Sequence, residues 1–387
     1  MSANDLPVAV IGAGPIGLAA AAHLVERGIP VVVYEAGQTV GANVRDWAHV
    51  RIFTTWEQSV DTASRRLLEA TGWSLPDPDA LPTGEDIYRH YLKPLARHQA
   101  LSPHIRTDAK VVRITRAGAD KMSSKGRDAK PFELRIESSD GAQQTVRARA
   151  VIDASGTWQN QNPLGASGLD AEGERRFQDR IAYGMPDVLG AQRARYADKR
   201  IAVVGGGYSA INVLLDLAQL CRNAARTNVT WIVRGKNMNR IYGGGEADQL
   251  PARGKLGSLL RPLVEQGRIT LVRGFHTNAI VGNGVGLTLK GTIDETAHEV
   301  SGIDEIIACT GQRPDLDMTR ELRLELDPWL EGVKALGPLI DPNLHSCGSV
   351  PPHGHRELSH PEPGLYTIGV KSYGRAPTFL LLTGYEQ

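Results

Sequence analysis

The first glycine-rich segment of the chain has the residue spacing of a loop that binds the pyrophosphate of a dinucleotide. Gly12, Gly14 and Gly17 stand as G-x-G-x-x-G between an apolar run and a helix-like run, and Glu35 ends the next apolar run. The first glycine allows a tight turn, the second admits a pyrophosphate against the backbone, and the third lets helix and strand pack closely. This context argues against an ordinary glycine-rich turn. The expected contacts are Gly12, Ala13, Gly14, Pro15, Ile16, Gly17 and Glu35.

A second glycine loop lies in mid-chain, and the residue expected to contact its ribose differs from that of the first loop. Ala210 stands where the third glycine would be, and the next apolar run ends in Arg234 instead of an acidic residue. A guanidinium can pair with a 2′-phosphate, which a carboxylate would repel. This loop therefore favours NADPH over NADH, unless Arg234 is only a solvated residue at the end of a strand. The expected contacts are Gly205, Gly207, Tyr208, Ser209, Ala210 and Arg234.

Each loop must be held by a strand on one side and a helix on the other. The hydrophobic periodicity predicts this order twice, and two such βαβ units imply two parallel sheets. The predicted elements are strand Val8–Gly12, helix Pro15–Arg27 and strand Val31–Glu35, then strand Ile201–Gly205, helix Tyr208–Cys221 and strand Val229–Val233.

Further short strands predict a small antiparallel meander beside each unit. The first comprises Val111–Gly118, Phe132–Ser138 and Thr145–Gly156, with a polar loop at 121–130, and the second precedes a closing strand within Gly302–Gly311. The last residues predict a strand and then an apolar helix with Pro377 near its first turn. The expected fold class is α/β, with two doubly wound Rossmann-like domains.

The composition is that of a globular protein and excludes several classes of function. The 387 residues include 44 basic and 43 acidic ones, and no basic stripe marks a nucleic-acid partner. The N-terminus lacks the features of a signal peptide, and no apolar run approaches the ~20 residues that span a bilayer. We therefore expect a cytoplasmic protein without a nucleic-acid or membrane partner, and no pattern indicates its oligomeric state.

Neither a redox dithiol nor a metal site is expected. The three cysteines, Cys221, Cys309 and Cys347, form no C-x-x-C pair. Histidines near the end could suggest a metal, but they lie among prolines and match no standard zinc spacing. They are His345, His353, His355 and His360.

The order of the two glycine loops resembles that of the two-dinucleotide-binding-domain flavoproteins, in which a nicotinamide domain is inserted into an FAD domain. Ile152–Trp158 and Ile306–Asp315 look like the two crossover segments of these proteins. The resemblance implies FAD on the first loop and NADPH on the second. It implies an FAD-binding domain at residues 1–165 and 311–387 and an NAD(P)H-binding domain at 198–310. It also implies FAD contacts at Val112, Ser155, Gly156 and Gly369.

Within this superfamily the chain is most similar to the flavin-containing and N-hydroxylating monooxygenases. It has neither the C-x-x-C nor the C-x4-C of the disulfide reductases, and Val370 stands where many reductases place an aspartate against the ribityl chain. The Baeyer–Villiger signature F-x-G-x-x-x-H-x-x-x-W is also unmatched at Phe177–Val188.

The resemblance implies that NADPH reduces the flavin and that molecular oxygen then oxidises a small substrate containing nitrogen, sulfur or a carbonyl group. The same motifs would serve a dithiol-free reductase for a quinone or a protein acceptor, or a flavin-binding sensor. No acid–base dyad or activated nucleophile stands out, so the flavin itself is expected to carry the reaction. Candidate flavin-pocket residues, which could equally be packing or helix-cap residues, are Arg51, Trp56, Lys371 and Arg375.

Overall fold

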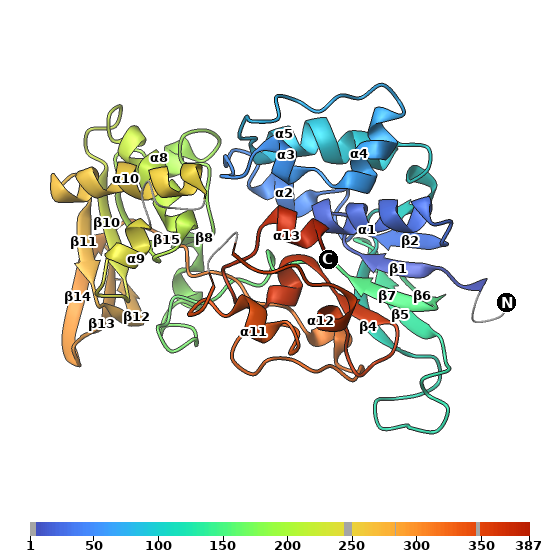
Figure 1. The fold of residues 1–387 in the computed structure, drawn as a ribbon. Helices are drawn as coiled ribbons and strands as arrows, with labels where there is room; N and C mark the ends of the chain where they lie inside the picture. Colours follow the sequence, from blue (N-terminus) through green and yellow to red (C-terminus); the bar gives the residue numbers. More distant parts are fainter. Residues whose placement is uncertain (1–4, 244–249, 283, 346–348) are drawn as a thin grey trace. The chain divides into compact units, whose positions relative to one another are not determined.

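The computed structural model describes residues 5–243, 250–282, 284–345 and 349–387 (Figure 1). The chain forms two compact units. Unit 1 consists of Met1–Asn160 together with Arg313–Gln387, and unit 2 consists of Gln161–Gln312. Unit 1 is therefore assembled from two separate stretches of sequence, and unit 2 from one continuous stretch.

A five-stranded parallel sheet forms the centre of unit 1. Its order is β16-β7-β1-β2-β3. The strands that follow β1 first, β2 and β3, lie on one side of it, and the later strands β7 and β16 lie on the other. Such a reversal is a topological switch point, and ligands of α/β proteins bind there, outside the carboxyl ends of the strands. All four residues of β1 are buried, as expected for a central strand. The strands are β1 (Val8–Ile11), β2 (Val31–Tyr34), β3 (Ile105–Arg106), β7 (Ala150–Asp153) and β16 (Leu365–Thr367).

Helix α1 (Pro15–Glu26) and a group of shorter helices pack against one face of this sheet. Leu18 and Ala22 share a buried cluster with Val33 of β2. Asp61 is the N-cap of α4 (Thr62–Glu69), and its other carboxylate oxygen lies 3.0 Å from Nε2 of His23 on α1. This contact fixes α4 against α1. The short helices include α3 (Trp56–Ser59), α11 (Gly337–Ile340) and α12 (His355–Leu358).

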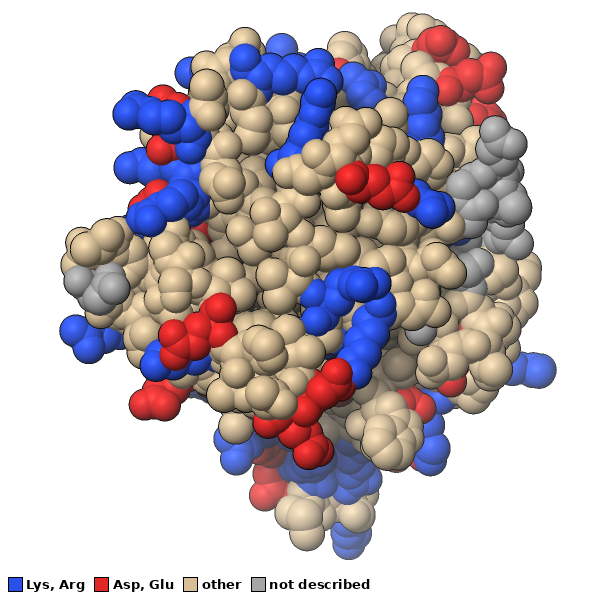
Figure 2. All heavy atoms as spheres, turned by 90° about the vertical axis from the view of Figure 1, so that its left-hand side faces the viewer, with Lys and Arg blue, Asp and Glu red and all other residues tan. Residues whose placement is uncertain are grey.

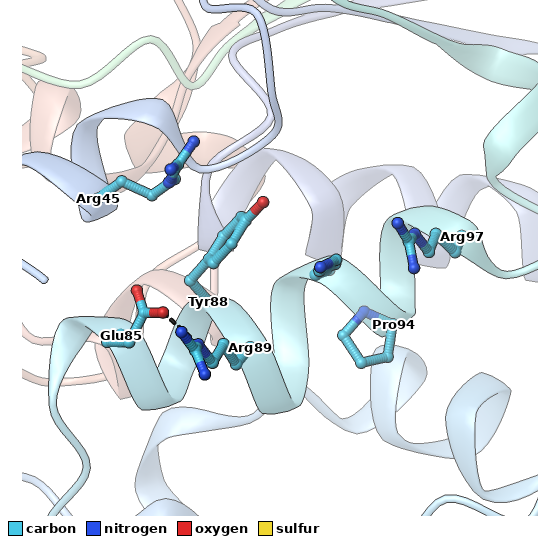
Figure 3. A pocket seen from close by; sticks show the side chains of 7 residues that line it. Arg45, Glu85, Tyr88, Arg89, Pro94 and Arg97 are labelled. Atoms are coloured by element: carbon cyan, nitrogen blue, oxygen red, sulfur yellow. Dashed lines mark hydrogen bonds and ion pairs between the residues drawn. The ribbon is translucent and has the colours of Figure 1, made fainter.

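An uninterrupted helical segment runs from Gly84 to Arg97 in unit 1. It consists of α5 (Gly84–Ile87), the π-helical turn η2 (Tyr88–Leu92) and α6 (Lys93–Arg97), part of which is shown in Figure 3. Pro94 accounts for the wide turn because it has no N–H to donate to the carbonyl of His90. That carbonyl instead accepts a hydrogen bond of 2.8 Å from the indole of Trp73.

A three-stranded meander covers the opposite face of the sheet. It consists of β4 (Lys110–Arg116), β5 (Phe132–Glu137) and β6 (Gln143–Ala148), and Phe132 shares a buried cluster with Ile11 of β1. The prediction of one strand over Thr145–Gly156 is wrong. The N–H of Arg149 donates to the carbonyl of Pro7 at 3.0 Å, so the chain leaves the meander there and continues as β7 in the parallel sheet.

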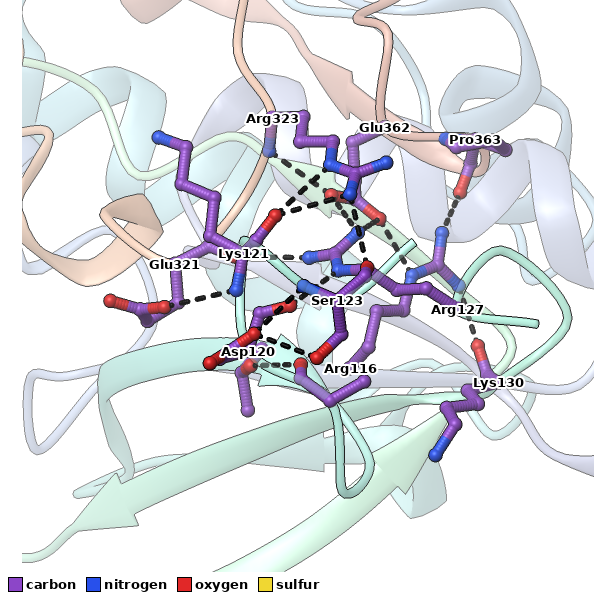
Figure 4. Close-up of polar contacts among 12 residues, drawn as sticks. Arg116, Asp120, Lys121, Ser123, Arg127, Lys130, Glu321, Arg323, Glu362 and Pro363 are labelled. Atoms are coloured by element: carbon purple, nitrogen blue, oxygen red, sulfur yellow. Dashed lines mark hydrogen bonds and ion pairs between the residues drawn. The ribbon is translucent and has the colours of Figure 1, made fainter. Parts of the chain in front are cut away.

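A buried ion cluster ties the loop between β4 and β5 to the C-terminal part of unit 1 (Figure 4). Glu362 is fully buried and accepts hydrogen bonds from Arg127 at 2.6 Å and from Arg116 at 2.7 Å. Burial alone would raise the pKa of Glu362, but these hydrogen bonds outweigh burial and lower the pKa. Arg127 lies in the segment that was predicted to be a polar loop, yet its side chain is completely buried.

The C-terminal helix differs from the prediction. After β16 the chain forms a 3-10 turn, η7 (Gly369–Tyr373), which ends where Gly374 adopts a φ of +62°. Helix α13 spans only Leu381–Tyr385. The side chain of Thr383 accepts a hydrogen bond from the N–H of Leu380 and caps the helix there, so Pro377 precedes the helix instead of lying in its first turn.

Unit 2 is built around a second parallel sheet, with the order β11-β10-β9-β15-β8. Its strand order also reverses at the strand that precedes the glycine loop, β9. Trp231 on β10 is fully buried in the core beneath this sheet. The strands are β8 (Ile181–Tyr183), β9 (Arg200–Val204), β10 (Asn228–Val233), β11 (Thr270–Arg273) and β15 (Glu305–Ala308).

Helices and a second meander complete unit 2. Helix α8 (Tyr208–Leu220) follows the glycine loop, and α9 (Asn239–Tyr242) packs against α10 (Pro251–Glu265) so closely that a Cβ on Gly257 would lie 1.7 Å from the carbonyl oxygen of Tyr242. The meander consists of β12 (His276–Gly282), β13 (Leu287–Ile293) and β14 (Thr296–Ile303). The predicted α/β fold class with two parallel sheets and two meanders is thus confirmed.

The surface carries both signs of charge. Basic and acidic side chains are interspersed on the face that Figure 2 presents, in keeping with a net charge of +1. Among the described residues, no helix combines the length and the apolar character that crossing a bilayer requires.

Candidate functional site

The first glycine loop lies at the carboxyl end of β1, the middle strand of the sheet of unit 1. Gly12 has a φ of +94°, and a Cβ at this position would lie 2.7 Å from the carbonyl oxygen of Ala154. A Cβ on Gly17 would lie 1.9 Å from the carbonyl oxygen of Gly12. Gly14 differs, because no atom lies within 4 Å of its ideal Cβ position. The fold therefore needs the outer two glycines, whereas Gly14 faces open space at the N-terminus of α1, a position suited to phosphate.

Glu35 lies beside this loop, directly after β2. Its carboxylate is 9% exposed and accepts hydrogen bonds from the N–H of Ala13 at 2.7 Å and of Gly37 at 2.8 Å. Burial raises the pKa of Glu35, and these two hydrogen bonds offset part of the rise. Each carboxylate oxygen keeps acceptor capacity for a ribose hydroxyl, because an ionised carboxylate offers about four lone-pair sites. The residues present thus fit the ribose and pyrophosphate of a dinucleotide.

The loops after β7 and β16 lie on the other side of the switch point. Ser155 and Gly156 follow β7, Gly369 follows β16, and the two glycines have φ angles of +74° and +67°. The N–H of Gly369 donates to Oε1 of Gln387 at 2.6 Å. Parallel pairing of β16, β7, β1 and β2 places all of these expected FAD contacts at the same edge of the sheet.

A buried ion pair joins the two loops, and the sequence interpretation missed it. Nζ of Lys371 lies 2.7 Å from Oδ2 of Asp153, with the two side chains 3% and 1% exposed, and it donates to Oγ of Ser155 at 3.0 Å. Lys371 is one of the candidate flavin-pocket residues, and in the structure its positive charge is matched by Asp153. No local signal marks this pair, because Asp153 ends β7 whereas Lys371 lies in η7, far along the chain.

Two further candidates lie away from the glycine loop. Val112 occupies a register irregularity between β4 and β5, and its carbonyl accepts a hydrogen bond of 2.7 Å from the side chain of Arg113. Arg375 is exposed, and its backbone N–H donates a hydrogen bond to the carbonyl of Leu330 at 2.6 Å.

The remaining pocket candidates have packing and chain-linking roles in the structure. Trp56 is 4% exposed within the helical core of unit 1, with its ring edge-on to His90. The side chain of Arg51 donates to the carbonyl of Leu81 and so links two stretches of loop.

The second glycine loop lies at the carboxyl end of β9 in unit 2. Gly205 has a φ of +143°, and a Cβ there would lie 2.2 Å from the carbonyl oxygen of Cys309. The carbonyl of Gly205 accepts a hydrogen bond of 2.7 Å from the indole of Trp231 on the neighbouring strand. Gly207 is the N-cap of α8 and, like Gly14 in unit 1, has no atom within 4 Å of its ideal Cβ position. The two units therefore repeat one arrangement of fixed and open glycines.

The residues after Gly207 complete this arrangement. Tyr208, Ser209 and Ala210 form the first turn of α8, and the side chain of Arg253 on α10 lies over the Tyr208 ring at 5.7 Å. Arg234 follows β10, is exposed, and donates one hydrogen bond of 3.1 Å to the carbonyl of Ala166. Its guanidinium retains further N–H donors for an anion.

These two glycine loops agree with what comparison with known proteins shows. The profile described as pyridine nucleotide-disulphide oxidoreductase matches residues 9–331, which is most of the chain. The chain belongs to this family. FAD and a pyridine nucleotide are its cofactors.

Sequence relatives of this oxidoreductase are flavin-containing monooxygenases. Human flavin-containing monooxygenase 1 is 24% identical over 246 residues, which cover 62% of this chain and 42% of that protein. A putative flavin-containing monooxygenase 2 of Arabidopsis thaliana is 28% identical over 240 residues, covering 59% and 50%. The chain thus spans half the length or less of these relatives.

Solved structures share the fold over nearly the whole chain. A bacillithiol disulfide reductase of Bacillus cereus superposes with a TM-score of 0.70 at 19% identity, covering 98% of this chain and 95% of that one. DfoA, a cadaverine monooxygenase of Erwinia amylovora that was crystallised with FAD, superposes with a TM-score of 0.65 at 12% identity, covering 98% and 92%.

The described cysteines of this oxidoreductase are free thiols, and each is at least partly buried. Burial raises the pKa of Cys309 to about 12, and its thiol donates to the carbonyl of Gly184. Burial also raises the pKa of the half-buried Cys221. A thiol with a raised pKa is a poor nucleophile at neutral pH. Cys347 lies outside the described residues.

The histidines of the C-terminal segment take part in separate contacts. His353 contacts the side chain of Gln387 at 2.9 Å, and His360 contacts Oγ1 of Thr367 at 2.9 Å. Burial lowers the pKa of His360. Within the described ranges, no three histidine, cysteine, aspartate or glutamate side chains are grouped as metal ligands would be.

Proposed function

We propose that this protein is an NADPH-dependent flavoprotein monooxygenase that acts on a small substrate containing nitrogen, sulfur or a carbonyl group. The observation that carries the proposal is the pair of open dinucleotide loops in a chain without a C-x-x-C or C-x4-C pair. Electrons that reach the flavin then have no dithiol in the chain to receive them, which favours molecular oxygen as the acceptor. The monooxygenase relatives support the same reading.

Each unit contributes binding groups to this activity. In unit 1, Gly12, Gly14 and the N-terminus of α1 would hold the pyrophosphate of FAD, and Glu35 its ribose. In unit 2, Gly205 and Gly207 would hold the pyrophosphate of NADPH. The bound flavin supplies two-electron transfer from NADPH to oxygen, of which one atom enters the substrate and the other leaves as water.

Arg234 is proposed to select NADPH by pairing with its 2′-phosphate. Replacement by alanine should raise KM for NADPH about tenfold or more, because a charge-assisted pair contributes roughly 1.5–3 kcal/mol. KM for NADH should change little. Steady-state kinetics with both nucleotides measure the difference.

Arg222 provides the matched control for this measurement. It is exposed and lies beyond the C-terminal end of α8, whereas Arg234 lies at the carboxyl edge of the sheet. Arg222→Ala should therefore leave both KM values unchanged. Equal changes for NADPH and NADH in Arg234→Ala would remove Arg234 from the 2′-phosphate site.

Oxygen and peroxide balances test the reaction itself. FAD-loaded protein should oxidise NADPH and consume an equimolar amount of oxygen. With a panel of small amines, thioethers and ketones, an accepted substrate should replace released hydrogen peroxide by oxygenated product. Rapid turnover with a quinone, together with peroxide release that no panel member lowers, would establish the reductase instead. Absence of NADPH oxidation under all conditions would indicate a flavin-binding sensor.

A further inference from the structure

A cavity in unit 1 is lined by residues of the helical region and by none of the glycine loop. Its volume is about 720 Å³, which lies within the range of small-molecule sites. The segment Gly84–Arg97 forms one wall and Arg45 of α2 (Ala42–Asp46) the other (Figure 3). The lining residues are Arg45, Glu85, Tyr88, Arg89, Lys93, Pro94 and Arg97.

Cations predominate along the helical wall. Arg89, Lys93 and Arg97 follow one another at intervals of four residues, a spacing at which like charges destabilise a helix. Glu85 pairs with Arg89. In the part of the chain that the structure describes, Lys93 and Arg97 form no ion pair.

The π-helical turn η2 improves the alignment of these cations. In a straight α-helix, residues four apart drift around the axis by about 40° per interval. The wider turn between Arg89 and Lys93 takes up an additional residue and reverses part of this drift, so the three side chains stay on the wall of one cavity. Such π turns occur frequently at functional sites.

The opposite wall holds its cation in a fixed place. The guanidinium of Arg45 lies 5.1 Å from the centre of the Tyr88 ring, and it donates to Oγ1 of Thr39 at 3.3 Å. The N-cap of α2 is Gly41, where a Cβ would lie 2.9 Å from a methyl carbon of Leu92. The start of α2 therefore packs directly on η2.

We propose that this cavity binds a small ligand that carries two adjacent phosphate groups. Guanidinium groups match phosphate oxygens in a bidentate geometry, and the lining combines the cations Arg45, Arg89, Lys93 and Arg97 with the single carboxylate of Glu85, a net positive charge that two adjacent phosphates match better than one. The bound anion would relieve the repulsion among Arg89, Lys93 and Arg97. None of the lining residues belongs to the glycine loop of unit 1, and the proposal does not depend on the proposed monooxygenase activity.

Calorimetric titration of the FAD-loaded protein with inorganic diphosphate tests the proposal. Binding should saturate at one diphosphate per chain, at a constant ionic strength set with sodium chloride. The double variant Lys93→Gln/Arg97→Gln should weaken binding at least tenfold. The double variant Lys125→Gln/Arg135→Gln, which removes two exposed cations elsewhere in unit 1, should not.

Two results would overturn the proposal. They are absence of saturable binding and equal affinity in both double variants. The same titration with a nucleoside diphosphate distinguishes an organic ligand from free diphosphate. Tighter binding of the nucleoside diphosphate indicates an organic ligand, and equal or weaker binding indicates free diphosphate. Circular dichroism confirms that each variant is folded.

Discussion

Replacement of Gly14 by valine is expected to abolish FAD binding while the protein remains folded. Gly14 has φ and ψ of −79° and −173°, which any residue adopts, and no atom lies near its ideal Cβ position. Valine would instead fill the space in which a pyrophosphate approaches the backbone. The ratio of flavin to protein absorbance should fall to zero, with an unchanged circular dichroism spectrum. The melting temperature should fall to that of wild-type protein stripped of FAD, because bound ligand stabilises the native state.

Two other glycines control this experiment. Gly235 also has no atom within 4 Å of its ideal Cβ position, but it belongs to unit 2, so Gly235→Val should retain FAD. Gly17→Ala should fail to fold, because its Cβ would overlap the carbonyl oxygen of Gly12. Stoichiometric FAD in Gly14→Val would reject the first loop as the flavin site.

Replacement of Glu362 by glutamine is expected to cause a large loss of stability in a protein that still folds. The variant leaves the guanidinium groups of Arg116 and Arg127 buried without a carboxylate, and breaking a buried ion pair in this way costs about 3–5 kcal/mol. Denaturant titration should show a lower midpoint for the variant. Limited proteolysis should show earlier cleavage between β4 and β5, because the loop there loses its anchor.

Glu57→Gln is the matched control for Glu362→Gln. Glu57 pairs with Arg65 at 3.1 Å, but both side chains are exposed, and surface pairs contribute about 0–1 kcal/mol. The control should therefore unfold at nearly the wild-type denaturant concentration. Equal midpoints for Glu362→Gln and the control would show that the buried cluster does not stabilise unit 1.

The glycine loops could be predicted from the sequence because their requirements are local. Gly12, Gly17 and Gly205 stand where a side chain would collide with backbone, and such constraints leave a fixed spacing in the sequence. The strands and helices beside them were predictable for the same reason, since hydrophobic periodicity is also a local signal.

The buried ion pairs could not be predicted, because their partners lie far apart in the sequence. Asp153 and Lys371 come into contact only when β16 pairs with β7. Arg127 is buried only because the folded chain places Glu362 beside it. A polar stretch of sequence indicates solvent exposure unless its counter-charge is known. The break between β6 and β7 was missed for a similar reason, since the bond from Arg149 to Pro7 joins distant residues.

The sheet order of unit 1 has a consequence for synthesis on the ribosome. Strand β16 pairs with β7, yet all of unit 2 is translated between them. Until β16 emerges, β7 is an unpaired edge that can associate with other chains. Unit 2 has no such gap in its sequence and can fold as soon as it is complete. Expression at lower temperature should therefore increase the yield of native protein, because aggregation through the unpaired edge of β7 slows during the time that synthesis of β16 requires.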